Sequence, residues 1–380
     1  MPNRLYVDVH VLQTVPPSNI NRDDNGTPKH ALYGGVRRSR VSSQAWKRAT
    51  RLAFTDSVPK QDLATRTKRI STLLANVLAA QSGLDQQQAA RLSTALLAPL
   101  GIKPGKKADD TAYLLFFGRK QLDAIAGLVA DQARELAGLS DAELKKHCDK
   151  LPIIETLNSG HPIDVALFGR MVADIKGLNV DAAVQVAHAL STHGVETEFD
   201  YYTAVDDENV EDSGAGMIGT IEFNSATLYR YATVSVHQLL ENLAEPEATA
   251  DAVRCFIDAF VRCMPSGYGN SFAPRTLPHL VLVAMREDQP VNLVSAYEKA
   301  VRGGANGIAE ESARRLAAEF QTVNETWGTA PTAHFSTYYL GEGDEAKSLV
   351  DALGRPAALP QLLDGTHETV TAWLAAGVDA

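Results

Sequence analysis

Residues 5–15 read LYVDVHVLQTV. β-branched and aromatic side chains are frequent in this stretch, which predicts a β-strand at the start of the chain. The polar segment Pro16–Pro28, rich in Asn, Asp and Gly, has the composition of a turn. Ser42 or Ser43 then stands where a residue can cap a helix running from Ala45 to Phe54. The first part of the fold is therefore predicted to be strand, turn and helix.

Further along the chain, helical and extended patterns alternate. The region from about 61 to 150 is strongly helical, with leucine-rich amphipathic stripes. The later segments are predicted as a strand at Asp164–Val172, an alanine-rich helix at Asp181–Ser191, an acidic and aromatic arm or hairpin at 195–219, a long β run at Thr220–Val236, a helix at Glu247–Met264 and a buried strand at Leu280–Met285. This order predicts an α+β core with two insertions.

Composition narrows the class of protein. The chain has 380 residues, of which 45% are hydrophobic and 22% charged, as in ordinary globular proteins. The apolar runs are too short to span a bilayer, and the N-terminal sequence lacks the apolar core of a signal peptide. Three cysteines at unrelated spacings do not form a disulfide framework, and no histidine or cysteine spacing predicts a zinc site. We expect a reduced, cytoplasmic protein with no membrane contact, no metal and no cofactor.

The positive charge of the chain is concentrated in one tract. Residues 29–51 contain no Asp or Glu and seven basic residues: Lys29, Arg37, Arg38, Arg40, Lys47, Arg48 and Arg51. The whole chain carries 36 basic and 46 acidic residues, so 29 basic residues oppose those 46 acids outside the tract. The tract includes Gly34-Gly35 and opens a helix, which favours a site for phosphates. A solvated basic loop that pairs with the acidic remainder is the alternative.

Three other groups of residues could carry chemistry. Asp23 and Asp24 follow the first strand, where carboxylates could hold a metal or act as a base, but an Asx-turn is favoured. Phe199, Tyr201 and Tyr202 on the acidic arm could stack on bases, or pack in a core or against a neighbouring subunit. Met171 by itself indicates core packing. The adjacent Arg170 is more suggestive of a functional site, but it does not decide between the two interpretations.

Several strings occur together in a characteristic order. They are NRDD (21–24), YGGVRRSRVSSQ (33–44), DVALFGRM (164–171), FDYYTAVDD (199–207) and YRYA (229–232). Taken together, they resemble the backbone subunit of the type I-E CRISPR Cascade complex, the CasC family. The resemblance extends from about residue 5 to residue 300, and its specificity comes from the series rather than from any single string.

The resemblance implies a hand-shaped protein. Its palm is a modified RNA-recognition-motif (ferredoxin-like) fold that carries a helical fingers insertion and an extended thumb arm. The implied boundaries are palm at 1–60, fingers at 61–150, palm at 151–194, thumb at 195–225, and the rest of the palm with C-terminal helices at 226–380. The implied function is non-catalytic: copies assemble head to tail along guide CRISPR RNA and present its bases to a target DNA strand. The implied partners also include the other Cascade subunits and a recruited helicase-nuclease.

Site residues follow from the resemblance by position. Arg22, Gln44, Lys47 and Arg51 are implied contacts to the guide-RNA backbone. Arg37, Arg38 and Arg40 in the segment Gly34–Arg40 are implied RNA-binding residues that support those contacts. Arg170 and Met171 are also implied RNA-binding residues, and Met171, after the Gly-Arg pair, is the implied apolar wedge against a displaced nucleotide. Tyr201 and Tyr202, with Phe199 and Thr203, hold the thumb positions near the guide–target duplex. Tyr201 departs from the family, which can carry the larger Trp there.

Two alternatives remain at this stage. The first is a metal-dependent ribonuclease like the type III backbone subunits, with Asp23 or Asp24 as the catalytic aspartate. The second is a protein-only filament module, in which the basic tract of one copy meets an acidic patch of its neighbour.

Overall fold

The computed structural model describes residues 4–102, 110–112, 114–172, 175–204, 217–304, 306–340 and 343–378. The chain forms two compact units. The first consists of 1–53, 184–237 and 253–380, and the second of 54–183 and 238–252. The second unit therefore contains the predicted helical segment 61–150 and also 151–183, which the resemblance assigns to the palm.

The first unit is built on an antiparallel sheet. Its central strand β1 (Tyr6–Ser18) pairs with β9 (Met217–Ser235) on one side and with β10 (Leu280–Arg286) on the other. The main path of the sheet runs β11-β10-β1-β9-β7-β3-β2, and β6 and β8 also pair with β9. The other strands are β2 (His30–Tyr33), β3 (Val36–Val41), β6 (Val184–Val186), β7 (Ala189–Ser191), β8 (Glu198–Ala204) and β11 (Ala333–Tyr338).

Both faces of β1 are buried, because successive side chains of a strand point to opposite faces and helices cover each of them. Leu12 belongs to a core with Tyr229, Leu282 and Phe320, the last of which comes from α12. On the opposite face, the Arg230 side chain lies between the rings of Trp46 and Phe260. The helices of this unit include α1 (Ser43–Ala53), α11 (Gly269–Phe272), α12 (Gly307–Trp327), α13 (Gly343–Leu353) and α14 (Leu359–Val378). The helices α9 (Val236–Leu243) and α10 (Pro246–Arg262) carry residues of both units.

The second unit is mainly helical and has its own core. Its helices are α2 (Ile70–Ser82), α3 (Gln86–Leu97), α4 (Arg119–Gly127), α5 (Ala133–Gly138), α6 (Asp141–Cys148), α7 (Ile153–Leu157) and α8 (Ile163–Phe168), and β4 (Ala64–Thr67) pairs with β5 (Leu115–Gly118). Leu74, Leu78, Leu92 and Leu96 from the predicted amphipathic stripes are buried in one cluster. Within the described residues, no helix is long and apolar enough to cross a membrane.

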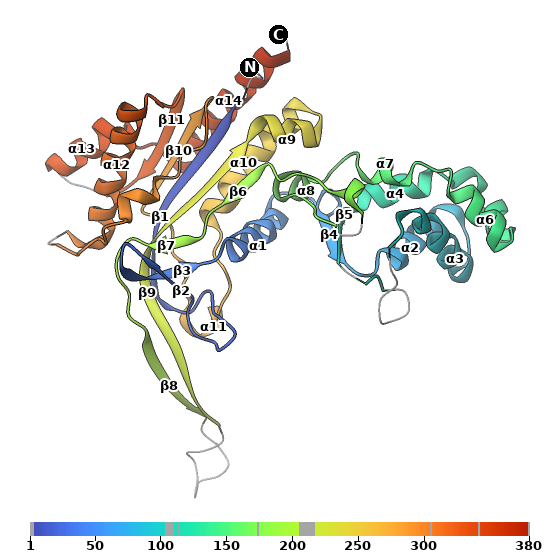
Figure 1. The fold of residues 1–380 in the computed structure, drawn as a ribbon, viewed down its shortest axis with the longest axis horizontal. Coiled ribbons are helices and arrows are strands. Elements are labelled where there is room, and N and C mark those ends of the chain that lie inside the picture. The colour runs from blue at the N-terminus through green and yellow to red at the C-terminus, as the bar shows by residue number, and fades with distance from the viewer. Residues whose placement is uncertain are drawn as a thin grey trace, which may run out of the picture. The chain divides into compact units, whose positions relative to one another are not determined.

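Most predicted elements are confirmed. The strand at 5–15, the β run at 220–236, the helix at 247–264 and the buried strand at 280–285 correspond to β1, β9, α10 and β10. The arm is an antiparallel hairpin of β8 and the residues Met217–Phe223 of β9, which extends beyond the other strands of its unit (Figure 1). We use "the arm" for this hairpin. Residues 205–216, which include Asp206 and Asp207, lie outside the described residues. The fold combines helices with an antiparallel sheet, which agrees with the predicted α+β class.

Two element predictions are wrong. The predicted strand at 164–172 instead contains most of the helix α8, which ends at Phe168 and is followed by Gly169 with a φ of 74°. The Asp164 carboxylate of this helix accepts a hydrogen bond from the Ala64 N–H at 2.9 Å. The predicted alanine-rich helix at 181–191 is replaced by β6 and β7, which pair with β9. In both segments a weak local preference yields to the contacts of the folded chain.

Candidate nucleic-acid interface

The predicted basic helix presents one polar face. α1 buries Trp46 and Thr50, and the Ser42 hydroxyl accepts the Ala45 N–H at 3.3 Å at its start. Because a helix repeats every 3.6 residues, the residues at i, i+3, i+4 and i+7 share the opposite side. That side carries Gln44, Lys47, Arg48 and Arg51, which we call the α1 face. Gln44 and Arg48 are exposed, while partial burial lowers the pKa of Lys47.

The segment 19–28, which we call the Arg22 loop, is fixed to the start of α1. The Asn21 side-chain oxygen accepts the Ser42 N–H at 2.8 Å, and the Asn21 carbonyl accepts the Lys29 N–H at 2.9 Å. Arg22 itself is exposed, and its guanidinium carbon lies 4.6 Å from the centre of the Tyr268 ring. Arg22 and the α1 face therefore lie in the same unit. The side chain of Asn21, next to Arg22, connects the Arg22 loop to the start of α1.

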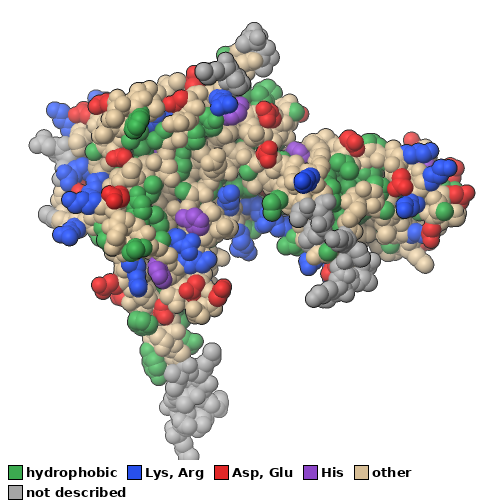
Figure 2. Space-filling model, viewed as in Figure 1, with side chains coloured by type: hydrophobic (Ala, Val, Ile, Leu, Met, Phe, Trp, Pro, Cys, Tyr) green, Lys and Arg blue, Asp and Glu red, His purple; other side chains and the backbone are tan. Residues whose placement is uncertain are grey.

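The arginines of β3 divide by exposure. Arg37 is exposed, and the Arg40 Nη1 lies 3.3 Å from the His188 Nδ1. Arg38 is fully buried, and its guanidinium donates to the carbonyls of Ser191 (3.0 Å) and Tyr297 (2.9 Å). The prediction that Arg38 contacts RNA is therefore corrected: its donors are used inside the fold, so it supports the surface instead. In Figure 2, Lys and Arg side chains gather over the part of the first unit that carries α1 and β3.

The Gly34-Gly35 pair forms the turn between β2 and β3. Both glycines have positive φ values, 57° and 74°, as a tight two-residue hairpin turn requires. A Cβ on Gly34 would lie 1.7 Å from the Glu298 carbonyl oxygen, so no larger residue fits. The close approach that this glycine permits is thus to the protein backbone and not to a phosphate.

Arg170 and Met171 belong to the second unit and have opposite environments. Arg170 is buried and donates to the Leu178 carbonyl at 2.6 Å and to the Asn158 side chain at 2.9 Å, and burial lowers its pKa to about 10. Its predicted role as a direct RNA contact is corrected to that of a buried support. Met171, by contrast, is 87% exposed. The internal bonds of Arg170 hold the backbone in place where the next side chain projects into solvent.

On the arm, the predicted contact residues separate between two faces. Phe199, Tyr201 and Thr203 point to one face and Tyr202 to the other, because side chains alternate along β8. Phe199 is 67% exposed and Tyr201 is 64% exposed, whereas Tyr202 is 37% exposed. The arm therefore presents a pair of exposed rings at positions 199 and 201.

The two candidate aspartates lie in the Arg22 loop. The Asp23 carboxylate accepts the N–H groups of Asn25 at 2.9 Å and Thr27 at 3.0 Å, as in the Asx-turn favoured from the sequence. Asp24 is exposed. Within the described part of the chain, no group of three or more His, Cys, Asp or Glu residues is arranged to hold a metal ion.

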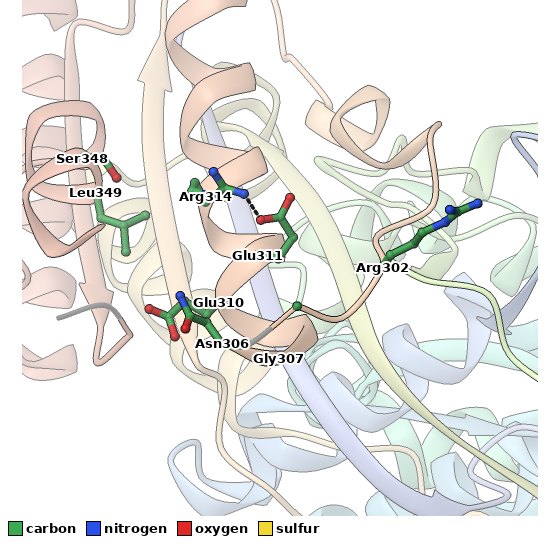
Figure 3. A pocket seen from close by; sticks show the side chains of 9 residues that line it. Arg302, Asn306, Gly307, Glu310, Glu311, Arg314, Ser348 and Leu349 are labelled. Carbon is green, nitrogen blue, oxygen red and sulfur yellow. Dashed lines mark hydrogen bonds and ion pairs between the residues drawn. The ribbon is translucent and has the colours of Figure 1, made fainter. Parts of the chain in front are cut away.

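A polar pocket at the start of α12 contrasts with the α1 face. It is lined by Arg302, Arg314, Glu310 and Glu311, among others. Figure 3 shows the Arg314 side chain reaching Glu311, which also accepts from Arg315 at 2.9 Å. Because two glutamates in its lining balance its two arginines in charge, this pocket is a poorer site for phosphate than the α1 face, which contains no acid.

Sequence reasoning missed two contacts of this surface. His188 lies beside Arg40 although the two are 148 residues apart in the chain. The Arg22 guanidinium lies over the Tyr268 ring although the two residues are far apart in the sequence. No local pattern could have revealed these two contacts.

Comparison with known proteins defines the class first. Two solved structures, each titled as a CRISPR RNA-guided surveillance complex, contain chains of this fold. The one described as pre-nicking matches with a TM-score of 0.82 and 33% identity over 96% of this chain and 100% of the other. The second matches with a TM-score of 0.71 and 30% identity over 96% and 99%.

The family follows from the sequence of the chain. The model of the CT1975-like protein family matches residues 7–364, and the chain belongs to that family. This confirms the resemblance to the Cascade backbone subunit that the ordered strings indicated. None of the curated proteins matches the chain.

Proposed function

We propose that this protein is a non-catalytic backbone subunit of a CRISPR RNA-guided surveillance complex, and that it grips the guide RNA with the α1 face and Arg22. The observation that carries the proposal is the α1 face itself. It places Gln44, Lys47, Arg48 and Arg51 on one side of a helix whose other side is anchored by Trp46, within a tract free of acids. Lysine and arginine in this arrangement bind successive phosphates without reading sequence.

The remaining parts of the protein take roles consistent with this grip. The first unit would be an RNA-recognition-type palm, in which β10, β1 and β9 form the antiparallel centre. The exposed Met171 would be the wedge against a displaced nucleotide, and the rings of the arm would approach the guide–target duplex. Copies would assemble along the RNA in the cytoplasm, together with other complex subunits, the target DNA strand and a recruited helicase-nuclease.

Partial burial of Lys47 adds a physical argument. Burial lowers its pKa because the ammonium loses hydration. A phosphate oxygen beside it would supply the missing negative charge. An RNA backbone on the α1 face would therefore stabilise Lys47 in its charged form.

The test is RNA binding by the full chain. Short single-stranded RNAs of different sequences are titrated by fluorescence anisotropy over a range of salt concentrations. The double variant Lys47→Ala/Arg51→Ala should bind all of them more weakly, and the slope of log K against log salt should fall by about 1.4, or about 0.7 per lost phosphate contact. The matched control is Lys347→Ala/Arg355→Ala, which removes two exposed basic residues of the same unit.

RNA that copurifies with the protein provides an independent result. Uniform short RNAs with repeat-derived ends are expected on sequencing. Equal binding by the wild type and by the Lys47/Arg51 double variant at moderate salt would refute the assignment of the α1 face.

A further inference from the structure

The segment between α10 and β10, residues 264–275, is a constrained loop packed against the Arg22 loop. Tyr268 and Ala273, which flank the short helix α11, have φ values of 45° and 44°. Residues other than glycine rarely adopt this left-handed conformation, and they keep it only where the surroundings impose it. Part of that constraint is visible at Gly267: a Cβ there would lie 2.5 Å from the carbonyl oxygen of Asn19.

Aromatic rings connect this loop to Arg22 and to the base of the arm. The Arg22 guanidinium lies over the Tyr268 ring, and the Tyr268 and Phe272 rings meet edge to face with centroids 6.4 Å apart. Phe272 in turn lies 5.7 Å from Phe223 of β9, between ring centroids. A guanidinium stacked on a ring keeps its in-plane N–H groups available for phosphate oxygens. Tyr268 is therefore a positioning residue for Arg22.

The 264–275 loop also lines an open cavity of about 670 Å³. This volume lies within the range of about 300–1,000 Å³ that is usual for small-ligand sites. Tyr268, Asn270, Ser271 and Arg275 supply a ring, an amide, a hydroxyl and a guanidinium to its lining. The last three are exposed, and the loop contains no Asp or Glu in a chain of net charge -10. The cavity thus offers an anion-compatible polar wall beside Arg22.

We propose that this cavity binds one nucleotide of single-stranded RNA, next to the phosphate held by Arg22. Arg275 contacts the phosphate of that nucleotide, and Asn270 and Ser271 bind its ribose or base edge. This inference rests on the proposed function and extends the RNA path from the α1 face past Arg22 onto the 264–275 loop. Contacts to the 2′-hydroxyl would distinguish RNA from DNA at this position.

The experiment measures binding of a labelled single-stranded RNA, and of the DNA of the same sequence, to the full chain by anisotropy. Arg275→Ala should weaken RNA binding about tenfold and reduce the salt slope by about 0.7. Tyr268→Leu should weaken it about threefold, since Arg22 loses its stacking partner, while Tyr268→Phe, which keeps the ring, should bind like the wild type. Asn270→Ala should affect RNA more than DNA, and Arg355→Ala is the control.

A second measurement locates the RNA directly. Photocrosslinking with 4-thiouridine RNA, followed by mass spectrometry, should yield a crosslinked peptide that includes residues 268–275. If Arg275→Ala and Tyr268→Leu bind like the wild type and no such peptide forms, while the Lys47/Arg51 double variant is weakened, the cavity inference is overturned and the proposed function stands. A wild-type protein that binds no RNA overturns both. If Tyr268→Leu proves unfolded by thermal melting, the exposed Arg275 and the crosslink decide the result.

Discussion

Tyr202 lies over Gly219, its direct partner across the β8–β9 hairpin. A Cβ built on Gly219 would lie 2.4 Å from the Tyr202 hydroxyl oxygen, so the ring occupies the space that the glycine leaves open. The neighbouring Tyr201 pairs with Thr220 and points to the other face. Two tyrosines that are adjacent in the sequence therefore have different surroundings: Tyr202 packs within the arm, and Tyr201 is exposed to solvent.

This difference predicts that mutations of Tyr202 and Tyr201 affect the stability of the arm differently. Gly219→Ala and Tyr202→Ala should each destabilise the hairpin by about 1 kcal/mol, because the ring loses its place or is absent. Both should speed hydrogen–deuterium exchange in Glu198–Ala204. Tyr201→Ala should leave exchange unchanged and instead weaken engagement of the guide–target duplex. The assignment would be wrong if Tyr201→Ala loosened the arm as much as Tyr202→Ala.

Arg37 and Arg38 should also respond differently to mutation. Arg38→Ala leaves buried carbonyls of Ser191 and Tyr297 without their donor, which should lower the free energy of unfolding by about 2–4 kcal/mol. Arg38→Lys should restore only part of this loss, because an ammonium cannot reproduce the planar fork. Arg37→Ala, at an exposed position, should stay within about 0.5 kcal/mol of the wild type. Urea unfolding of the three variants checks the order, and equal stabilities would contradict the buried role.

How well the sequence predicts a part of the site depends on how far apart in the sequence the contacting residues are. The α1 face depends on a cap and on helical spacing within eleven residues, so the sequence alone predicts it. The burial of Arg38 depends on Ser191 and Tyr297, more than a hundred residues away, and nothing in its own tract distinguishes it from Arg37.

The same reasoning explains the misassigned segment 181–191 and the missed Tyr268. The alanines at 182, 183, 187 and 189 favour a helix locally, but pairing with β9 decides the conformation. Tyr268 acquires its role from Arg22, which lies in a distant part of the sequence. The ordered strings shared with the family indicate the fold even where contacting residues are far apart in the sequence. They do not identify which side chain of a string is buried.

His188 should make RNA binding depend on pH. Burial, together with the charges of Arg40 and Lys29, lowers the pKa of His188 below its ordinary 6.5. A phosphate bound beside Arg40 would raise it, so the complex would take up a proton. Affinity should therefore rise as the pH falls from about 7.5 to 5.5, by up to about tenfold for each unit of difference between the free and bound pKa values. Isothermal titration in buffers of different ionisation enthalpy measures the proton uptake.

The control for this prediction is a second histidine of the same unit. His188→Gln should abolish the extra gain in affinity at low pH, whereas His334→Gln, at an exposed site beside Phe320, should retain it. A pH dependence that survives in His188→Gln would assign the proton to another group.

The buried ion pair of Asp8 and Arg286 should make stability depend on pH in the direction opposite to most carboxylates. The Arg286 Nε lies 3.3 Å from the Asp8 Oδ2, and both side chains are fully buried. Burial raises the pKa of Asp8 from 3.8 to about 6, although the Val291 N–H, the Tyr231 hydroxyl and the Arg286 charge oppose the shift. Between these two values the folded state binds more protons than the unfolded state. The contribution of Asp8, at most about 3 kcal/mol, is thus fully present below pH 4 and is lost as the pH rises through 6.

Comparison with Asp8→Asn isolates this contribution. Because the variant leaves the Arg286 cation buried without a carboxylate, its free energy of unfolding should be lower by about 3–5 kcal/mol at neutral pH. The wild type should exceed the variant by a larger margin at pH 4 than at pH 7, since only the wild type gains from protonation of residue 8. Chemical unfolding at a series of pH values measures the margin, with the exposed Asp24→Asn as the control. A margin that shrinks toward pH 4 would mean that the folded state lowers the pKa of Asp8, with the attraction of Arg286 outweighing the cost of burial.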